Sequence, residues 1–197
     1  MVVQPRAGGA GGARSDGDLV RDAKSGVRPA FDELVDRYQR RATSVAYRLV
    51  GNLHDALEVS QDAFVRAYRN LATLADEERF GSWFLRIVTN LSLNLRRARR
   101  VRQANGAGSG LGPDQPDVPD TSAERPGAQL AAAELAALLE RVLGELPEQQ
   151  RAALVLFSIE GLPQKEVAEI LGCSVEAVKW HVFQARRKTR ERLREYL

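Results

Sequence analysis

The chain has 197 residues and a mass of 21.7 kDa, so its length fits one domain or two small ones. Its net charge is only +3, and its single cysteine, Cys173, excludes an internal disulfide and a zinc site built from cysteines. No apolar run reaches the roughly 20 residues that cross a bilayer, and residues 1–15 lack the apolar core of a signal peptide. We therefore expect a cytoplasmic protein with a disordered tail at 1–15 and no membrane insertion.

The chain from Asp16 to about Arg102 has the apolar spacing of successive helices. A first long helix should end at the Gly51-Asn52 pair, and a second should span 55–71. A third follows a polar break at 75–79 and runs into arginines. Since the sequence has no sustained period-two alternation and no hairpin dipeptide, it predicts an all-α fold.

Residues 105–127 are rich in Gly, Pro and Asp and offer almost nothing to bury, which predicts a flexible linker and a domain boundary. The helical pattern resumes at Gln129, and Leu146-Pro147 should begin a further helix that Gly161 ends. We expect two helical domains, an N-terminal bundle and a C-terminal helix-turn-helix bundle, joined by this linker.

Basic residues gather in two blocks. No acidic residue occurs between Glu78 and Asp114, whereas seven arginines do, and residues 179–197 hold seven Lys or Arg against two Glu. Two separated basic blocks favour two contacts with a polyanion such as nucleic acid. For either block alone, ordinary solvated surface charge remains the alternative.

The most informative stretch, 161–194, reads as two short helices around a tight turn at Gly172, where glycine gives the needed backbone freedom. Ser174 suits the N-cap of the second helix. The second helix should bury one stripe spaced i, i+3, i+7, i+10: Val175, Val178, Val182 and Ala185. The opposite face then presents Glu176, Ala177, Trp180, Phe183, Gln184 and Arg187, with Lys179 and His181 on its flanks. A helix of this kind after such a turn fits the DNA major groove.

Three segments resemble, in order, parts of the extracytoplasmic-function sigma factors of bacterial RNA polymerase. DALEVSQDAFVRAYRNL (55–71) is similar to the helix that binds the polymerase clamp, and FGSWFLRIVTNLSLNLRR (80–97) to the helix that opens and reads the −10 promoter element. Residues 146–188, from LPEQQRAALVLFSIEG to HVFQARRK, are similar to the domain that reads the −35 element. The resemblance covers most of 18–193. It implies a polymerase- and −10-binding domain at 16–103, a linker at 104–127 and a −35-binding domain at 128–197.

The resemblance also implies three sets of contact residues. Those for the core polymerase are Asp55, Glu58, Gln61, Asp62, Val65, Arg66 and Arg69. Those for capture of the melted −10 strand, which needs aromatic faces, amides and positive charge, are Arg79, Phe80, Trp83, Arg86, Asn90, Asn94, Arg96 and Arg97. Those for the −35 duplex, which needs side chains at base edges and cations on phosphates, are Ser174, Ala177, Lys179, Trp180, His181, Phe183, Gln184, Arg186, Arg187 and Lys188.

The implied partners are core RNA polymerase, through the clamp of its largest subunit, promoter DNA and an anti-sigma factor. We expect no enzyme, cofactor, metal or catalytic residue, because two histidines are too few for a metal or catalytic cluster and no nucleophile–base pair or phosphate loop is visible. The family often has Ser then Arg where Trp180 and His181 stand, and commonly Arg at Gln184. These departures imply an unusual −35 preference.

Several alternatives stay open at this level. Trp83 lies on the apolar stripe and fits a core position as well as a base platform, and Asn90 and Asn94 could be solvent-facing amides. Trp180 would be covered by DNA or by another protein, and the outward face of 55–71 could be an ordinary solvated helix. For the whole chain, the alternatives are a response-regulator-type helix-turn-helix activator without its receiver domain, an enzyme carrying basic helices, and a nonspecific nucleic-acid binder.

Overall fold

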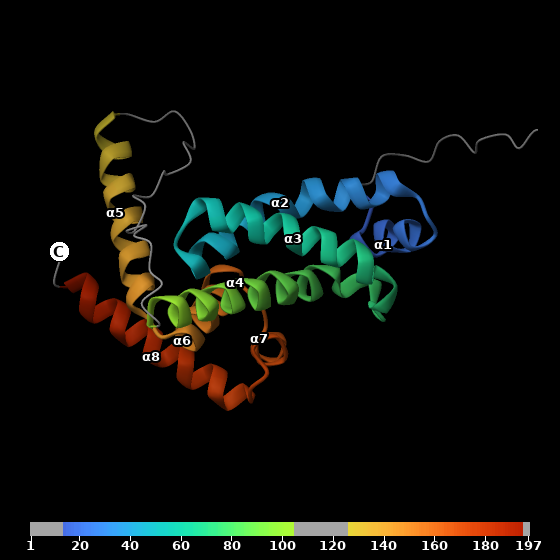
Figure 1. Cartoon of the computed structure of the whole chain (residues 1–197). Helices are drawn as coiled ribbons and strands as arrows, with labels where there is room; N and C mark the ends of the chain where they lie inside the picture. Colours follow the sequence, from blue (N-terminus) through green and yellow to red (C-terminus); the bar gives the residue numbers. More distant parts are fainter. Residues whose placement is uncertain (1–13, 105–125, 195–197) are drawn as a thin grey trace, which may run out of the picture.

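The computed structural model of the protein describes residues 14–104 and 126–194 (Figure 1). The tail expected at 1–15 falls almost entirely outside these residues, as does most of the linker expected at 104–127. Within the described residues all regular structure is helical and no strand occurs, which confirms the all-α prediction.

The N-terminal half is a bundle of four helices: α1 (Asp16–Lys24), α2 (Arg28–Val50), α3 (Leu53–Asn70) and α4 (Phe80–Ala104). The helix α2 packs against each of the other three, and α3 also packs on α4 (Figure 1). Gly51 ends α2 with a left-handed φ of 80°, which glycine adopts without a Cβ clash. The Asn52 side chain then caps α3 by accepting from the Asp55 amide at 3.0 Å, so the predicted boundary at this glycine–asparagine pair is correct.

The N-terminal core joins the predicted stripe of α2 to an aromatic cluster at the start of α4. Phe80 and Phe84 are fully buried. The Phe84 ring lies 4.4 Å from that of Phe64 on α3, and the Phe80 ring 5.3 Å from that of Tyr38 on α2, measured between centroids. This cluster fixes the beginning of α4 against both neighbouring helices.

The C-terminal half contains α5 (Pro126–Glu145), α6 (Glu148–Leu154), α7 (Gln164–Leu171) and α8 (Val175–Arg194). The helix α5 begins three residues before Gln129, so the end of the expected linker is helical. Gly172 has a φ of 64° between α7 and α8, as the sequence predicted for a tight turn. The Ser174 hydroxyl accepts from the Ala177 amide at 3.1 Å and so caps α8.

A wide helical turn interrupts the single helix that was expected between Pro147 and Gly161. After α6, residues Val155–Ile159 adopt π-helical geometry, and the Glu160 amide donates to the Val155 carbonyl at 2.9 Å. Such i→i+5 turns are rare and local. A sequence pattern of helical apolar spacing does not distinguish them from an ordinary helix.

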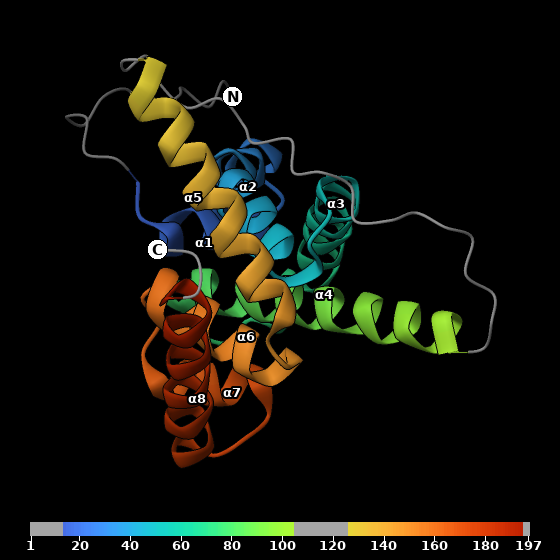
Figure 2. The ribbon, with the colours of Figure 1, turned by 90° about the vertical axis from the view of Figure 1, so that its left-hand side faces the viewer.

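The two halves pack against each other. Buried apolar residues of both halves form one continuous cluster, and α6, α7 and α8 stand beside α4 and below the N-terminal bundle (Figure 2). The buried Arg151 of α6 donates from Nη1 to the Leu49 carbonyl at the end of α2, at 3.0 Å. The halves therefore make a specific contact with each other.

Replacing Ser174 with alanine should lower the free energy of unfolding by about 1 kcal/mol, because α8 loses its side-chain cap. Urea unfolding of the intact chain would measure this loss. Ser174→Asp preserves a capping oxygen and should retain most of the stability. Equal midpoints for wild type and Ser174→Ala would show that the hydroxyl does not stabilise α8.

Candidate functional site

The outward face of α8 has the composition expected from the sequence. Val178, Val182 and Ala185 are buried, which confirms three of the four positions of the predicted stripe, while Val175 is half-buried. On the opposite face, the side chains of Trp180 and Phe183 are 53% and 63% exposed. Exposing two large aromatic side chains on one helix is unfavourable unless a partner covers them.

The polar side chains of α8 differ in their exposure to solvent. Lys179 and Arg187 are exposed, whereas Gln184 and Lys188 are partly buried. The ring of His181 lies 5.1 Å from that of Trp180, edge to face, and burial lowers its pKa. Burial therefore favours the uncharged form of this imidazole. The outward face of α8 thus offers aromatic and amide groups to a partner rather than a cationic histidine.

Arg186 is engaged by its own half of the protein. Its Nη2 donates to the Ser158 hydroxyl at 3.1 Å, and its guanidinium lies 5.7 Å from the centroid of the Phe157 ring. Cation–π contacts of this kind orient an arginine. Ser174 is likewise used as a helix cap, as described above. These two side chains are held in place before any ligand arrives.

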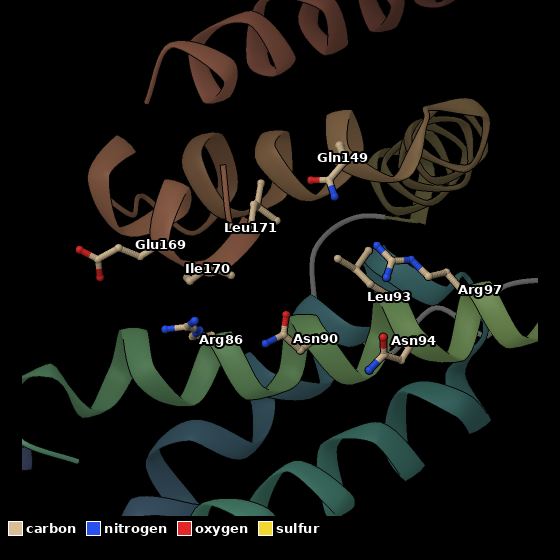
Figure 3. Close-up of a pocket in the computed structure, with 10 residues that line it drawn as sticks. Arg86, Asn90, Leu93, Asn94, Arg97, Gln149, Glu169, Ile170 and Leu171 are labelled. Atoms are coloured by element: carbon tan, nitrogen blue, oxygen red, sulfur yellow. The ribbon is translucent and has the colours of Figure 1, made fainter. Parts of the chain in front are cut away.

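One face of α4 carries four of the expected strand-capture residues: Arg86, Asn90, Asn94 and Arg97. All four are exposed, and they line a hollow of about 300 Å³ together with residues of α6 and α7. Figure 3 shows Arg86 and Asn90 on α4 opposite Ile170 and Leu171 of the helix-turn-helix unit. The structure thus brings the two asparagines and two arginines onto one surface.

Other expected strand-capture residues lie deeper. Phe80 is fully buried, with its ring in the aromatic cluster, so no face of it is open to a base. Trp83 is partly buried against the core and also lines a second hollow with Arg79, which makes it both a core residue and an edge of the surface. Arg96 is half-buried and donates to the Leu49 carbonyl at 2.9 Å. Phe80 and Arg96 support α4 in this structure.

The outward face of α3 is exposed over nearly all of the residues expected to bind polymerase: Glu58, Gln61, Asp62, Val65, Arg66 and Arg69. Asp55 is the exception, because its side chain is buried and forms an ion pair with Arg99 of α4. The same face includes Leu57 and Tyr68, which are about half exposed and were not singled out from the sequence. Leu57, Gln61, Val65 and Tyr68 are spaced at i, i+4, i+8 and i+11, and this helical spacing could have identified Leu57 and Tyr68 as part of the same face.

Sequence comparisons place both halves in known families. Residues 34–102 match the family described as Sigma-70 region 2, and residues 136–189 match Sigma-70, region 4. The ECF RNA polymerase sigma factor SigW of Bacillus subtilis is 31% identical over 180 residues, which cover 89% of this chain and 95% of SigW. The chain belongs to the ECF RNA polymerase sigma factors. SigE of Mycolicibacterium smegmatis is 36% identical over 186 residues, covering 92% of this sigma factor and 67% of SigE.

Solved structures support the same fold. CnrH, in complex with the cytosolic domain of CnrY, superposes with a TM-score of 0.66 at 28% identity, over 92% of this sigma factor and 99% of CnrH. The sigma factor RpoE of Bartonella quintana, in complex with the anti-sigma factor NepR, has a TM-score of 0.68 at 18% identity and supports the fold. It covers 83% of this chain and 96% of the RpoE chain.

The family assignment argues against the response-regulator-type activator. A response-regulator-type activator would share only the helix-turn-helix, whereas this sigma factor also matches region 2 across α2, α3 and α4. In the described part of the chain there is no group of three His, Cys, Asp or Glu placed to hold a metal ion. Among the described helices, none has the length and apolar character to cross a membrane.

Proposed function

We propose that this sigma factor binds core RNA polymerase through α3, captures the melted −10 strand through α4 and reads the −35 duplex through α8. One observation supports this division above others. Asn90, Asn94, Trp180 and Phe183 project from the regions matched to Sigma-70 regions 2 and 4, and all four are exposed. These amides and aromatic rings are therefore accessible to a partner, and large exposed aromatic side chains mark interaction surfaces.

For duplex DNA, α8 offers a helix whose outward face fits the major groove. Lys179 and Gln184 supply a cation and an amide for base edges, and Trp180 and Phe183 supply apolar contact, for example with thymine methyl groups. Arg187 and Lys188 follow about one turn after Phe183 and Gln184 and would contact phosphates. The aromatic pair and the neutral His181 distinguish this face from a purely cationic one.

For a separated strand, α4 offers amides flanked by arginines. Asn90 and Asn94 lie one turn apart, so both reach the same side of the helix, and each amide can both donate to and accept from a base edge. Arg86 and Arg97 flank them and would hold the phosphates. Trp83 lies at the edge of this surface, and the ring of the buried Phe80 packs against it and holds it in position.

For the polymerase, α3 offers a mixed apolar and charged face. The exposed side chains of Leu57, Val65 and Tyr68 form a strip, and Gln61, Asp62 and Arg66 surround it. Apolar centres with charged rims are typical of protein–protein interfaces. We assign this face to the clamp of the largest polymerase subunit. Asp55, which is buried, supports the surface through Arg99.

The remaining elements of the proposal concern partners and place. We propose an anti-sigma factor as a further partner, since the structural neighbour RpoE of Bartonella quintana is bound to the anti-sigma factor NepR. Polymerase and chromosomal DNA are cytoplasmic in bacteria, so we assign this sigma factor to the cytoplasm. We assign the chemistry of RNA synthesis to the polymerase and none to this chain, which uses no metal or cofactor of its own in the proposal.

Transcription with purified bacterial core polymerase on a genomic promoter library tests the function, and Asp62→Arg tests the polymerase-binding face. Wild type should direct transcripts from defined starts. Asp62→Arg should weaken core binding by about tenfold, because it reverses a charge at the rim of the interface. The new residue also faces Arg66, but that like-charge pair costs only about 0.3–0.5 kcal/mol, so the fold survives.

Glu134→Arg makes the same charge change on α5, away from α3, and should leave core binding unaltered. Fluorescence anisotropy of labelled protein with core polymerase would measure both variants. Equal affinities for Asp62→Arg and wild type would show that α3 does not face the polymerase. The absence of any transcript with wild type would refute the function itself.

A further inference from the structure

The outward face of α8 carries an acidic side chain beside its aromatic residues. Glu176 and Trp180 are one turn apart and lie within about 40° of each other around the helix axis, and both are exposed. The opposite side of the helix is buried at Val178, Val182 and Ala185. Glu176 therefore lies near the middle of the face proposed to enter the major groove. It is not among the contact residues assigned above to the −35 duplex.

No specific contact within the described part of the chain accounts for Glu176. The Ser174 hydroxyl already caps α8 by accepting from the Ala177 amide, and a capping box needs its acid at Ala177, three residues after the cap. The other acidic residue of α8, Glu191, pairs with Arg187 at 3.8 Å, whereas Glu176 forms no ion pair with any residue that the structure describes. Its charge suits the first turn of α8 through the helix dipole, which is a general effect of any acid there.

A carboxylate on a DNA-reading face is selective because it accepts hydrogen bonds and donates none. Phosphates repel it, and so do the acceptors that guanine and thymine present in the major groove, where only cytosine N4 and adenine N6 offer donors. At adenine, the N7 acceptor lies beside the amino group and opposes the second carboxylate oxygen. At cytosine, the neighbouring C5 carries only a hydrogen. Cytosine is therefore the base whose major-groove edge best matches Glu176.

We propose that Glu176 is a specificity-determining residue of α8 and accepts a hydrogen bond from the N4 amino group of a cytosine in the −35 element. This inference rests on the proposed function of α8 and names one base that the helix reads. The neighbouring indole of Trp180 excludes water from this part of the groove once DNA is bound. An unpaired carboxylate is costly where water is excluded, so a wrong base at this position weakens binding.

The cations around Glu176 supply the attraction that the carboxylate opposes. Lys179 and Arg187 are exposed on the same side of α8, and their attraction to phosphates does not depend on sequence. A carboxylate among them weakens binding to every duplex, and weakens it least where a cytosine amino group meets it. Glu176 therefore contributes to specificity by rejecting the other sequences, while the cations contribute affinity.

Selection by the holoenzyme from promoters with a randomised −35 element tests the proposal, with the rest of the promoter taken from one found in the transcription assay. With wild type, one position should favour cytosine about five- to tenfold over guanine or thymine, as expected for one contact to a base edge. Glu176→Gln should shift the same position to adenine, because a glutamine amide matches adenine N6 and N7. Glu176→Ala should leave this position without a preference.

Removing one amino group from the DNA tests the contact itself. In the selected promoter, the cytosine is replaced by pyrimidin-2-one, which pairs with guanine but lacks the N4 amino group. Wild-type holoenzyme should bind this duplex about fivefold more weakly, and Glu176→Ala should bind the two duplexes equally. This double-mutant cycle cancels any weakening of the duplex itself. As a control for net charge, Glu134→Gln removes an exposed carboxylate from α5 and should keep the cytosine preference.

Four results are distinguishable. A cytosine preference that both Glu176 variants change, and that needs the amino group only in wild type, supports the proposal. A preference that depends on Glu176 but is for another base refutes the cytosine assignment. If a −35 sequence is selected and every preference survives both substitutions, Glu176 reads no base and acts only on the helix dipole, while the role of α8 stands. If wild type selects no −35 sequence, the roles of α8 and Glu176 are refuted together.

Discussion

Replacing Asn90 and Asn94 together with alanine should reduce open-complex formation by about 10- to 100-fold. A loss of this size is about 1.4–2.8 kcal/mol in total, which is near the lower end of what two contacts to base edges contribute at about 1–3 kcal/mol each. Both side chains are exposed on α4, so their loss opens no cavity and the bundle should keep its stability. Permanganate reactivity of melted thymines would measure the effect on wild-type promoter DNA.

Polymerase binding separates this role from a general defect. The double variant should bind core polymerase as wild type does, because the two asparagines lie on α4 and the proposed polymerase face lies on α3. Gln39→Ala removes an exposed amide from α2 and should not alter melting. Full melting by the double variant would show that α4 does not capture the strand through these amides.

Removing the aromatic pair of α8 should have a comparably large effect on duplex recognition. Trp180→Ala with Phe183→Ala should weaken binding of the holoenzyme to a −35 duplex by about 10- to 100-fold, since large aromatic side chains at the centre of an interface commonly contribute 2 kcal/mol or more. Because both side chains are more than half exposed, the truncations leave no internal void. The free energy of unfolding should stay close to that of wild type.

A matched apolar truncation in the same half controls for nonspecific loss of hydrophobic surface. Ile159 is 45% exposed and lies in the wide turn after α6, outside the recognition helix α8. Ile159→Ala should leave −35 binding unchanged. Electrophoretic mobility of holoenzyme on promoter fragments with intact and scrambled −35 elements would compare the variants. Undiminished discrimination by the Trp180 and Phe183 variant would show that other residues read the duplex.

The sequence predicts the features that depend on local spacing. The apolar stripe of α8, the turn at Gly172 and the cap at Ser174 follow from periodicity and from the chemistry of individual residues within a few positions of one another. The same reasoning predicted the exposed aromatic residue Trp180. These features recur in the structure because each is settled within one helix and its ends.

Burial against distant segments was not predictable in this way. Asp55 has the spacing of an outward residue of α3, yet Arg99, 44 positions later, pairs with it and covers it. Phe80 opens α4 like an exposed aromatic, yet Tyr38 and Phe84 enclose it. The Arg151 contact with the Leu49 carbonyl spans 102 positions. No local pattern encodes which distant partner a polar or aromatic group will meet.

The direction in which the chain leaves α6 follows from the wide turn at Val155–Ile159. An ordinary α-helix over the same residues would bring Glu160 out on another side of the axis, away from Arg41 and Arg48. The extra residue in this turn therefore sets the direction of the chain, so that the helix-turn-helix begins facing α4. Inserting or deleting a residue in this turn would change the orientation of α7 and α8 relative to α4, even where each of these helices stayed intact.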